Sequence, residues 1–284
     1  MRSSSIIITY VLLLKVLLSA LMVLMVCKIV FKSGVGIVSS VMVGLIVTAC
    51  SESEVDLLLS TDSIDVLDLK DVSVGESLGC PKLDLVCYAV DRRGKVRSSR
   101  AISVPVGDFC CPVSCVRLCV ELLDRLGVDF VKVGLAVRSF CDAYRLLRLA
   151  VEGASSAKIV ASCFGDWKLI GAVRPFEVID VARKLDVEHV LVDTRTKSGK
   201  CLLDFVGLDE LQRLVEYAHS HALKVAVAGG LTLSSVRLIV ESVPVDYVAV
   251  RSGVCVGGRG GRIDPVLLRR LISLVKSPEL VEQH

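Results

Sequence analysis

The amino-acid sequence predicts an α/β protein built as a (β/α)8 TIM barrel with an apolar N-terminal extension, and three observations support this. From residue 42 onward, eight short runs rich in β-branched residues alternate with longer amphipathic runs, which is the pattern of a parallel sheet covered by helices. The alternation fills residues 42–276, a length typical of one such barrel. The first run leads into Ser51, Glu52 and Ser53 rather than into the glycine-rich turn of a doubly wound sheet.

Each repeat supplies one strand, and a helix is predicted where the apolar residues change to helical spacing. Pro112 and Pro175 fall where the first turn of a helix tolerates a missing N–H. The predicted strands are 42–48, 64–70, 100–106, 129–134, 157–163, 188–193, 223–229 and 245–251. The predicted helices include 112–126, 174–185, 207–221 and 264–276, and residues 277–284 form a C-terminal tail.

Residues 1–41 form the apolar extension and contain no acidic residue. The uncharged stretch at residues 16–27 has 12 residues, whereas a spanning helix needs roughly 20. Two interpretations stay open: a membrane anchor, or a segment upstream of the working protein, with translation starting at a later methionine. If the segment spans a membrane, Lys28 and Lys32 outnumber Arg2 and keep the barrel in the cytoplasm. We expect a cytoplasmic barrel in either case, with membrane contact only through residues 1–41.

The charge balance argues against a nucleic-acid partner. The chain carries a net charge of +3, but residues 1–50 hold four basic residues and no acidic one, so the rest of the chain sums to −1. Proteins that bind nucleic acids normally present a basic face or stripe. A near-neutral body does not supply one.

The 12 cysteines are scattered along the chain, unlike those of a short disulfide scaffold. The densest cluster is Cys110, Cys111, Cys115 and Cys119, of which the last three lie on one stripe of a predicted helix. This spacing matches no zinc or iron–sulfur ligand pattern that we recognise. We therefore interpret the four as small buried apolar side chains and predict no metal site.

Four of the predicted strands repeat one phrase: IDVLDLK (64–70), VDFVKVG (128–134), VEHVLVD (187–193) and VDYVAVR (245–251). Side chains alternate between the two faces of a strand. The positions two and four residues past each acidic residue are all aliphatic, as expected beneath the outer helices: Leu67, Leu69, Val131, Val133, Val190, Val192, Val248 and Val250. The opposite face, toward the barrel interior, carries the charged residues Asp68, Lys70, Lys132, Asp193 and Arg251.

Two lysines inside a barrel need a physical reason, because a buried ammonium is costly unless it is paired. One explanation is structural: an ion pair of Lys70 with Asp68, or of Lys132 with Asp193. The other is chemical: an amine that attacks a carbonyl to form a Schiff base, its proton affinity lowered by a nearby cation or an apolar wall. The strand ends place both lysines toward the C-terminal mouth, where the active sites of such barrels lie.

Glycines gather after the predicted strands seven and eight. Loops at these positions commonly bind phosphate through exposed backbone N–H groups. We therefore expect a site for a phosphorylated aldehyde or ketone, formed by Gly229, Gly230, Ser252, Gly253, Gly257 and Gly258.

Several longer stretches resemble the (5-formylfuran-3-yl)methyl phosphate synthase family of methanofuran biosynthesis. They include LVDTRTKSGKCLLDF (191–205), HALKVAVAGG (221–230) and VDYVAVRSGVCVGGRGGRID (245–264), and the resemblance covers roughly residues 42–276. The resemblance implies a lyase that condenses two molecules of glyceraldehyde 3-phosphate into a phosphorylated furan aldehyde, with loss of phosphate and water. It also implies no cofactor.

The family's functional residues correspond to four positions of this chain. The resemblance implies that Lys70 forms the Schiff base and that Lys132 accepts and donates protons. The Asp and Lys of the family's DTxxK stretch match Asp193 and Lys197. Strand three fits the family's Val-Gly-Asp, whereas the loop after Lys70 lacks the family's proline and is slightly longer, with Glu76 inserted.

Two alternatives remain beside this function. A class I aldolase acting on another phosphorylated aldehyde or ketone would also use Lys70. A non-catalytic, membrane-tethered barrel would keep the fold without the chemistry. For the enzyme, we expect a small phosphorylated triose as substrate and a homo-oligomeric state.

Overall fold

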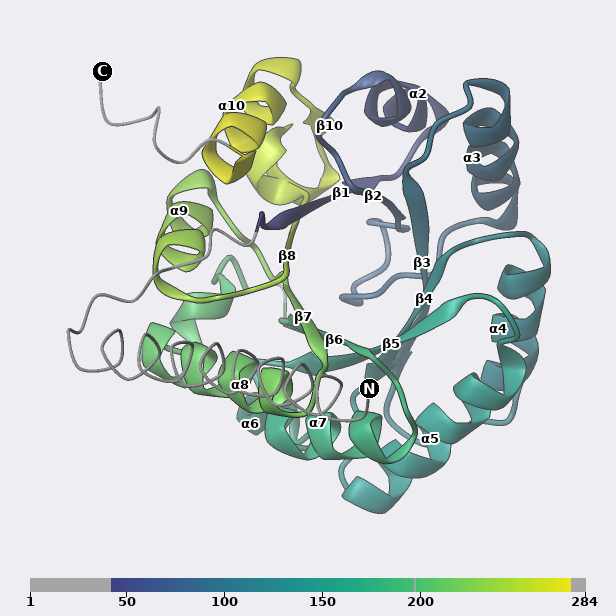
Figure 1. The fold of residues 1–284 in the computed structure, drawn as a ribbon, viewed down its shortest axis with the longest axis vertical. Helices are drawn as coiled ribbons and strands as arrows, with labels where there is room; N and C mark the ends of the chain where they lie inside the picture. Colours follow the sequence, from purple (N-terminus) through teal and green to yellow (C-terminus); the bar gives the residue numbers. More distant parts are fainter. Residues whose placement is uncertain (1–41, 197, 277–284) are drawn as a thin grey trace, which may run out of the picture. The chain divides into compact units, whose positions relative to one another are not determined.

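The computed structural model describes residues 42–196 and 198–276. The predicted N-terminal extension, the C-terminal tail and Lys197 therefore lie outside the described residues. The eight strands of the main sheet within that range close into one barrel in chain order (Figure 1). They are β1 (Gly44–Ala49), β2 (Val66–Leu69), β3 (Ala101–Phe109), β4 (Phe130–Leu135), β5 (Lys158–Phe164), β6 (His189–Asp193), β7 (Lys224–Val227) and β8 (Tyr247–Val250).

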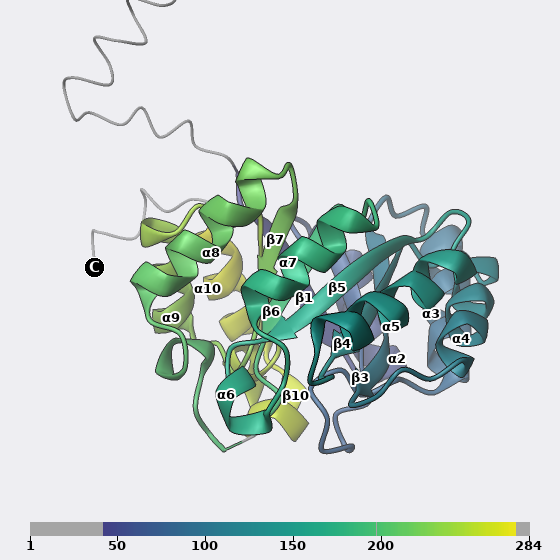
Figure 2. The same cartoon turned by 90° about the horizontal axis from the view of Figure 1, so that it is seen from below.

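Neighbouring strands pair in parallel, and β8 pairs with β1 to close the sheet. The helices lie outside the strands (Figures 1 and 2). They are α2 (Glu52–Ser60), α3 (Leu83–Lys95), α4 (Cys115–Arg125), α5 (Phe140–Gly153), α6 (Trp167–Ile170), α7 (Pro175–Lys184), α8 (Leu208–Ser220), α9 (Leu233–Ser242) and α10 (Pro265–Lys276). A two-stranded hairpin of β9 (Cys255–Val256) and β10 (Arg262–Ile263) follows β8. The predicted barrel is confirmed.

The predicted helix ends are close to the observed ones. Pro175 is the first residue of α7, as expected for a proline in a first turn. Pro112 instead precedes α4, which begins at Cys115. No helix between residues 42 and 276, Lys197 aside, is long and apolar enough to cross a membrane.

The alternation along the strands predicted the two faces of the barrel wall correctly. All eight aliphatic residues assigned to the outer face belong to the large apolar core between the strands and the helices. A second, smaller apolar cluster fills the barrel interior, with Val160, Leu191 and Ala226 from the strands and Ala228 just after β7. Leu78, from the loop between β2 and α3, joins this inner cluster and is fully buried. That loop therefore folds back over the barrel axis.

The interpretation of the cysteine cluster as buried side chains is wrong. Cys110, Cys111, Cys115 and Cys119 are all exposed free thiols. The buried face of α4 consists of Val116, Val120 and Leu123. The cysteine stripe precedes this valine stripe by one residue, and one residue is about 100° around a helix. Helical spacing identified the stripe, but burial is decided by which stripe meets β3 and β4.

One arginine joins the first and last strands. Arg251 follows β8, and its guanidinium donates to the Thr48 carbonyl oxygen at 2.8 Å and to Glu54 on α2 at 2.8 Å. It also donates to the carbonyl oxygens of Arg259 and Gly261 in the hairpin. Arg251 projects from the interior face of β8, as predicted. Its guanidinium, however, is bound by Thr48 and Glu54 at the seam between β1 and β8.

Candidate active site

Four charged side chains from β2, β4 and β6 meet inside the barrel. The Lys70 Nζ lies 3.6 Å from a carboxylate oxygen of Asp193 and 4.0 Å from one of Asp68. The Lys132 Nζ donates to the other oxygen of Asp68, and the Thr48 hydroxyl donates to Asp68 at 2.8 Å. Lys70, Lys132 and Asp193 therefore converge, as the strand alternation predicted.

The pairing differs in one respect from the expectation. The predicted pair of Lys70 with Asp68 is present, but Lys132 pairs with Asp68 rather than with Asp193. The reason is depth. Lys70 lines both the mouth at the carboxyl ends of the strands and the lumen below it, whereas Lys132 lines only the lumen. At that depth, Lys132 pairs with Asp68 of β2, which lies two residues before Lys70 in the chain.

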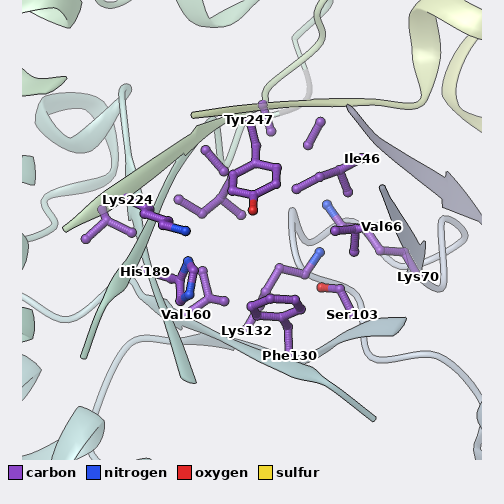
Figure 3. A pocket seen from close by; sticks show the side chains of 15 residues that line it. Ile46, Val66, Lys70, Ser103, Phe130, Lys132, Val160, His189, Lys224 and Tyr247 are labelled. Atoms are coloured by element: carbon purple, nitrogen blue, oxygen red, sulfur yellow. The ribbon is translucent and has the colours of Figure 1, made fainter. Parts of the chain in front are cut away.

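The lumen below the lysines is mostly apolar (Figure 3). The rings of Phe130 and His189 meet edge to face at 5.2 Å, and the side chain of Tyr247 also points into it (Figure 3). Burial in these surroundings lowers the pKa of Lys132 to about 8, although Asp68 opposes the change and Lys70 adds to it. An amine with this pKa can both accept and donate a proton near neutral pH.

Above the lysines lies a cavity of about 400 Å³ at the carboxyl ends of the strands. Of the residues predicted to bind phosphate, Gly229, Gly230, Ser252 and Gly258 line it, together with Lys70 and Asp193. Gly253 and Gly257 do not line the cavity. A Cβ on Gly253 would lie 2.6 Å from the Leu231 carbonyl oxygen, so this glycine lets the β8 loop approach the start of α9. Three of the five predicted glycines and Ser252 therefore line this mouth. Lys197 is not among the described residues.

Sequence reasoning missed Asp108, whose side chain is fully buried beside this mouth. By simple alternation, Asp108 would share the outer face with Val104 and Val106. A bulge between Pro105 and Asp108, with Gly107 at φ +120°, changes the register and redirects it. Asp108 accepts the Ser77 backbone N–H at 2.8 Å. Gly134 on β4 leaves the room, because a Cβ there would lie 2.5 Å from an Asp108 oxygen.

Burial raises the pKa of Asp108 to about 6, with smaller contributions from Asp193 and Glu76, while the Ser77 N–H and Arg195 act in the opposite direction. A folded-state pKa above the ordinary 3.8 means that folding favours the protonated carboxyl. The stabilisation from this group is complete below about pH 3.8 and is lost as the pH rises through 6. The full difference corresponds to about 3 kcal/mol.

Asp108→Asn should therefore remove a pH-dependent part of the stability. The asparagine stays neutral, so the free energy of unfolding of the variant minus that of the wild type should rise by about 3 kcal/mol between roughly pH 3.5 and pH 7.5. Urea unfolding at several pH values measures this difference. Asp62→Asn, at a fully exposed side chain, is the matched control and should show no such trend. A flat difference for Asp108→Asn would mean that Asp108 is ionised in the fold at no cost.

The fold and this site define the class of the protein: a TIM-barrel enzyme with its reactive groups at the carboxyl ends of the strands. The model of the 4-HFC-P synthase family matches residues 45–272 of the chain. The chain therefore belongs to the 4-HFC-P synthase family, and it is a lyase with (5-formylfuran-3-yl)methyl phosphate synthase activity by homology.

Curated relatives agree over most of the chain. The (5-formylfuran-3-yl)methyl phosphate synthase of Methanosarcina mazei is 30% identical over 226 residues, which is 78% of this chain and 94% of the relative. The enzyme of the same name from Methanocaldococcus jannaschii is 31% identical over 219 residues, 75% of this chain and 91% of the relative.

Solved structures support the fold alone. KGPDC from Streptococcus mutans superposes with a TM-score of 0.55 at 14% identity, covering 83% of this chain and 98% of that one. N-(5'-phosphoribosyl)anthranilate isomerase from Pyrococcus furiosus gives a TM-score of 0.53 at 14% identity, covering 82% and 98%.

Proposed function

We propose that the mouth of this barrel condenses two molecules of glyceraldehyde 3-phosphate through an imine on Lys70, as a step of methanofuran biosynthesis. The observation that carries the proposal is the position of Lys70. Lys70 lines both the mouth and the apolar lumen, so a substrate carbonyl can reach it from the mouth while the lumen gives it apolar surroundings. Asp193, 3.6 Å away, holds the amine in place.

The steps follow from imine chemistry. The neutral Lys70 amine attacks the aldehyde carbon of the first triose, and the carbonyl oxygen leaves as water. A base then removes the proton from the adjacent carbon to give an enamine. The second triose loses its phosphate by elimination, and the enamine carbon forms a carbon–carbon bond to the carbon that carried this phosphate. Ring closure, loss of water and hydrolysis of the imine complete the furan and free Lys70.

Lys132 is the proposed base and acid for these proton transfers. Its pKa of about 8 leaves a substantial neutral fraction at neutral pH. Its ammonium form is held by Asp68, so the proton that it gains has a fixed place. Asp193 and Lys197 are assigned to the same proposed site through the family's DTxxK stretch.

We also propose that Gly229 and Gly230 after β7, together with Ser252 after β8, bind the phosphate of the first triose. Gly229, Gly230 and Ser252 line the mouth beside the first turn of α9. Backbone N–H groups at a helix start attract a phosphate through their partial positive charge. The predicted cytoplasmic location and self-association stay predictions that accompany this function.

The direct test is incubation of the purified chain with glyceraldehyde 3-phosphate. We expect a phosphorylated furan aldehyde, seen by its ultraviolet absorbance and mass, together with one inorganic phosphate per furan. Borohydride added during turnover should attach the triose to Lys70. An adduct at Lys70 with an aldol product but no furan would favour the class I aldolase. The non-catalytic barrel has lost its support, because the chain belongs to a family of enzymes.

A further inference from the structure

We propose that Arg259 and Ser77 form a second phosphate-binding subsite, which takes the phosphate group of the second triose and releases it as inorganic phosphate. This inference rests on the proposed function and deepens it. The reaction takes up two phosphate groups and keeps one in the product. The mouth must therefore hold a phosphate that leaves as well as one that stays.

Arg259 presents a positive charge to the mouth that no carboxylate neutralises at close range. Its guanidinium lines the cavity and donates to the carbonyl oxygens of Glu76 at 2.6 Å and Val74 at 3.4 Å. Throughout residues 42–196 and 198–276, no ion pair forms between Arg259 and an acidic side chain. The other arginine of the mouth, Arg251, is held by Glu54. Arg259 is therefore the guanidinium available to an anion.

Ser77 supplies a hydroxyl at the same place. It lies next to Glu76, lines the same cavity and is only 2% exposed. Its Oγ has no hydrogen-bond partner among the residues that the structure describes, although a buried hydroxyl normally has one. Its backbone N–H is held by Asp108 at 2.8 Å, so its position is fixed. A phosphate oxygen bound by Arg259 can accept the missing hydrogen bond.

The proposed subsite lies across the mouth from Gly229 and Gly230. A Cβ on Gly229 would lie 2.9 Å from Thr194, and one on Gly230 would lie 3.0 Å from the Lys200 carbonyl oxygen. These contacts place the glycines over β6 and β7. Ser77 is joined instead to β3 through Asp108, and Arg259 to the loop after β2. The two phosphate positions are thus on different sides of one cavity, which Lys70 also lines.

The position suits the release of phosphate by elimination. A base takes the proton from the carbon next to the aldehyde carbon of the second triose, and the electron pair of that C–H bond forms a carbon–carbon double bond. The C–O bond to the phosphate then breaks, and its electron pair leaves with the phosphate oxygen. Arg259 balances the charge of the departing phosphate, which takes a proton from solvent. No oxidant, reductant or further reactant is needed.

Binding of inorganic phosphate tests the subsite without reference to turnover. Equilibrium dialysis with labelled inorganic phosphate should find two phosphates per wild-type chain and one for Arg259→Gln. Ser77→Ala, which keeps the backbone N–H, should weaken the second phosphate several-fold and leave the first unchanged. Arg262→Gln is the matched control, because Arg262 is an exposed arginine of the same hairpin outside the cavity. One phosphate in the wild type, or two in Arg259→Gln, would overturn the proposal.

Steady-state kinetics add an independent readout. In Arg259→Gln, the Lys70 adduct with a single triose should form as in the wild type, while the apparent KM for the condensation rises roughly 10- to 100-fold, the loss expected for a charge-assisted hydrogen bond. Arg259→Lys keeps the charge and should restore part of the phosphate binding, which a purely structural role of the guanidinium would not allow. If the wild type binds two phosphates but makes no furan, the proposed function fails and the subsite stands. If furan forms and Arg259→Gln is normal, only the subsite fails.

Discussion

Replacing Lys70 by arginine should abolish both furan formation and the borohydride-trapped adduct. Arginine keeps the positive charge beside Asp193, but its guanidinium stays protonated and cannot attack a carbonyl. We therefore expect turnover to fall to the background rate while the fold is retained. Mass spectrometry of the borohydride-treated protein, with the product measured in the same sample, checks both parts.

A matched control separates the chemistry from the substitution itself. Lys158 lies at the start of β5, and its side chain is 57% exposed, so Lys158→Arg should leave adduct and turnover unchanged. An adduct that persists in Lys70→Arg and maps to Lys132 or Lys197 would show that the nucleophile is assigned to the wrong lysine. The barrel and its phosphate sites would not be affected by that result.

Lys132→Ala should keep the adduct and lose turnover. A positioned acid or base typically contributes ~10²–10⁴-fold to a rate, so we expect kcat to fall by that factor while borohydride still traps a triose on Lys70. In the wild type, kcat should rise with pH to a plateau above about 8, because the neutral Lys132 amine is the proton acceptor and its pKa is about 8. This rise of kcat with pH should be absent from Lys132→Ala.

Loss of Lys132 also removes a partner of Asp68, which is only 1% exposed. An unpaired buried carboxylate destabilises a fold, so Lys132→Ala alone could lose activity through unfolding. Lys132→Gln is the second variant, because its amide can still donate to Asp68 but cannot accept a proton at neutral pH. Equal loss of kcat in both variants, with normal circular dichroism for Lys132→Gln, supports the acid–base role. Full activity in Lys132→Gln would contradict it.

The interior face of the barrel was predictable because strand alternation is a local property. Positions along each strand can be counted from the acidic residue near the start of each repeated phrase. The residues an odd number of positions further on face the interior, and these include Lys70, Lys132 and Asp193. Local reasoning failed where a distant contact decides. A bulge, not the alternation, directs Asp108 inward, and the stripe of α4 that meets the strands is one residue away from the cysteines.

The remainder of the site comes from the loops, whose conformation depends on partners far along the chain. Leu78 enters the barrel because Asp108 holds the backbone of Ser77 and Arg259 holds the carbonyl oxygen of Glu76. The last of these contacts joins residues 183 positions apart. No pattern within the loop itself indicates that it folds over the barrel axis.

The seam closed by Arg251 has a consequence for synthesis of the protein on the ribosome. Its bonds to Thr48 and Glu54 join residues 203 and 197 positions apart, and Lys276 returns to the Val43 carbonyl oxygen. The barrel therefore cannot close before nearly all of residues 42–276 have been translated, and until then the edge of β1 is unpaired and prone to aggregation. Thr48, which donates to Asp68 beneath Lys70, lies on that same strand. A chain that ends before β8 lacks both the partner strand of β1 and the Arg251 bonds that close the seam.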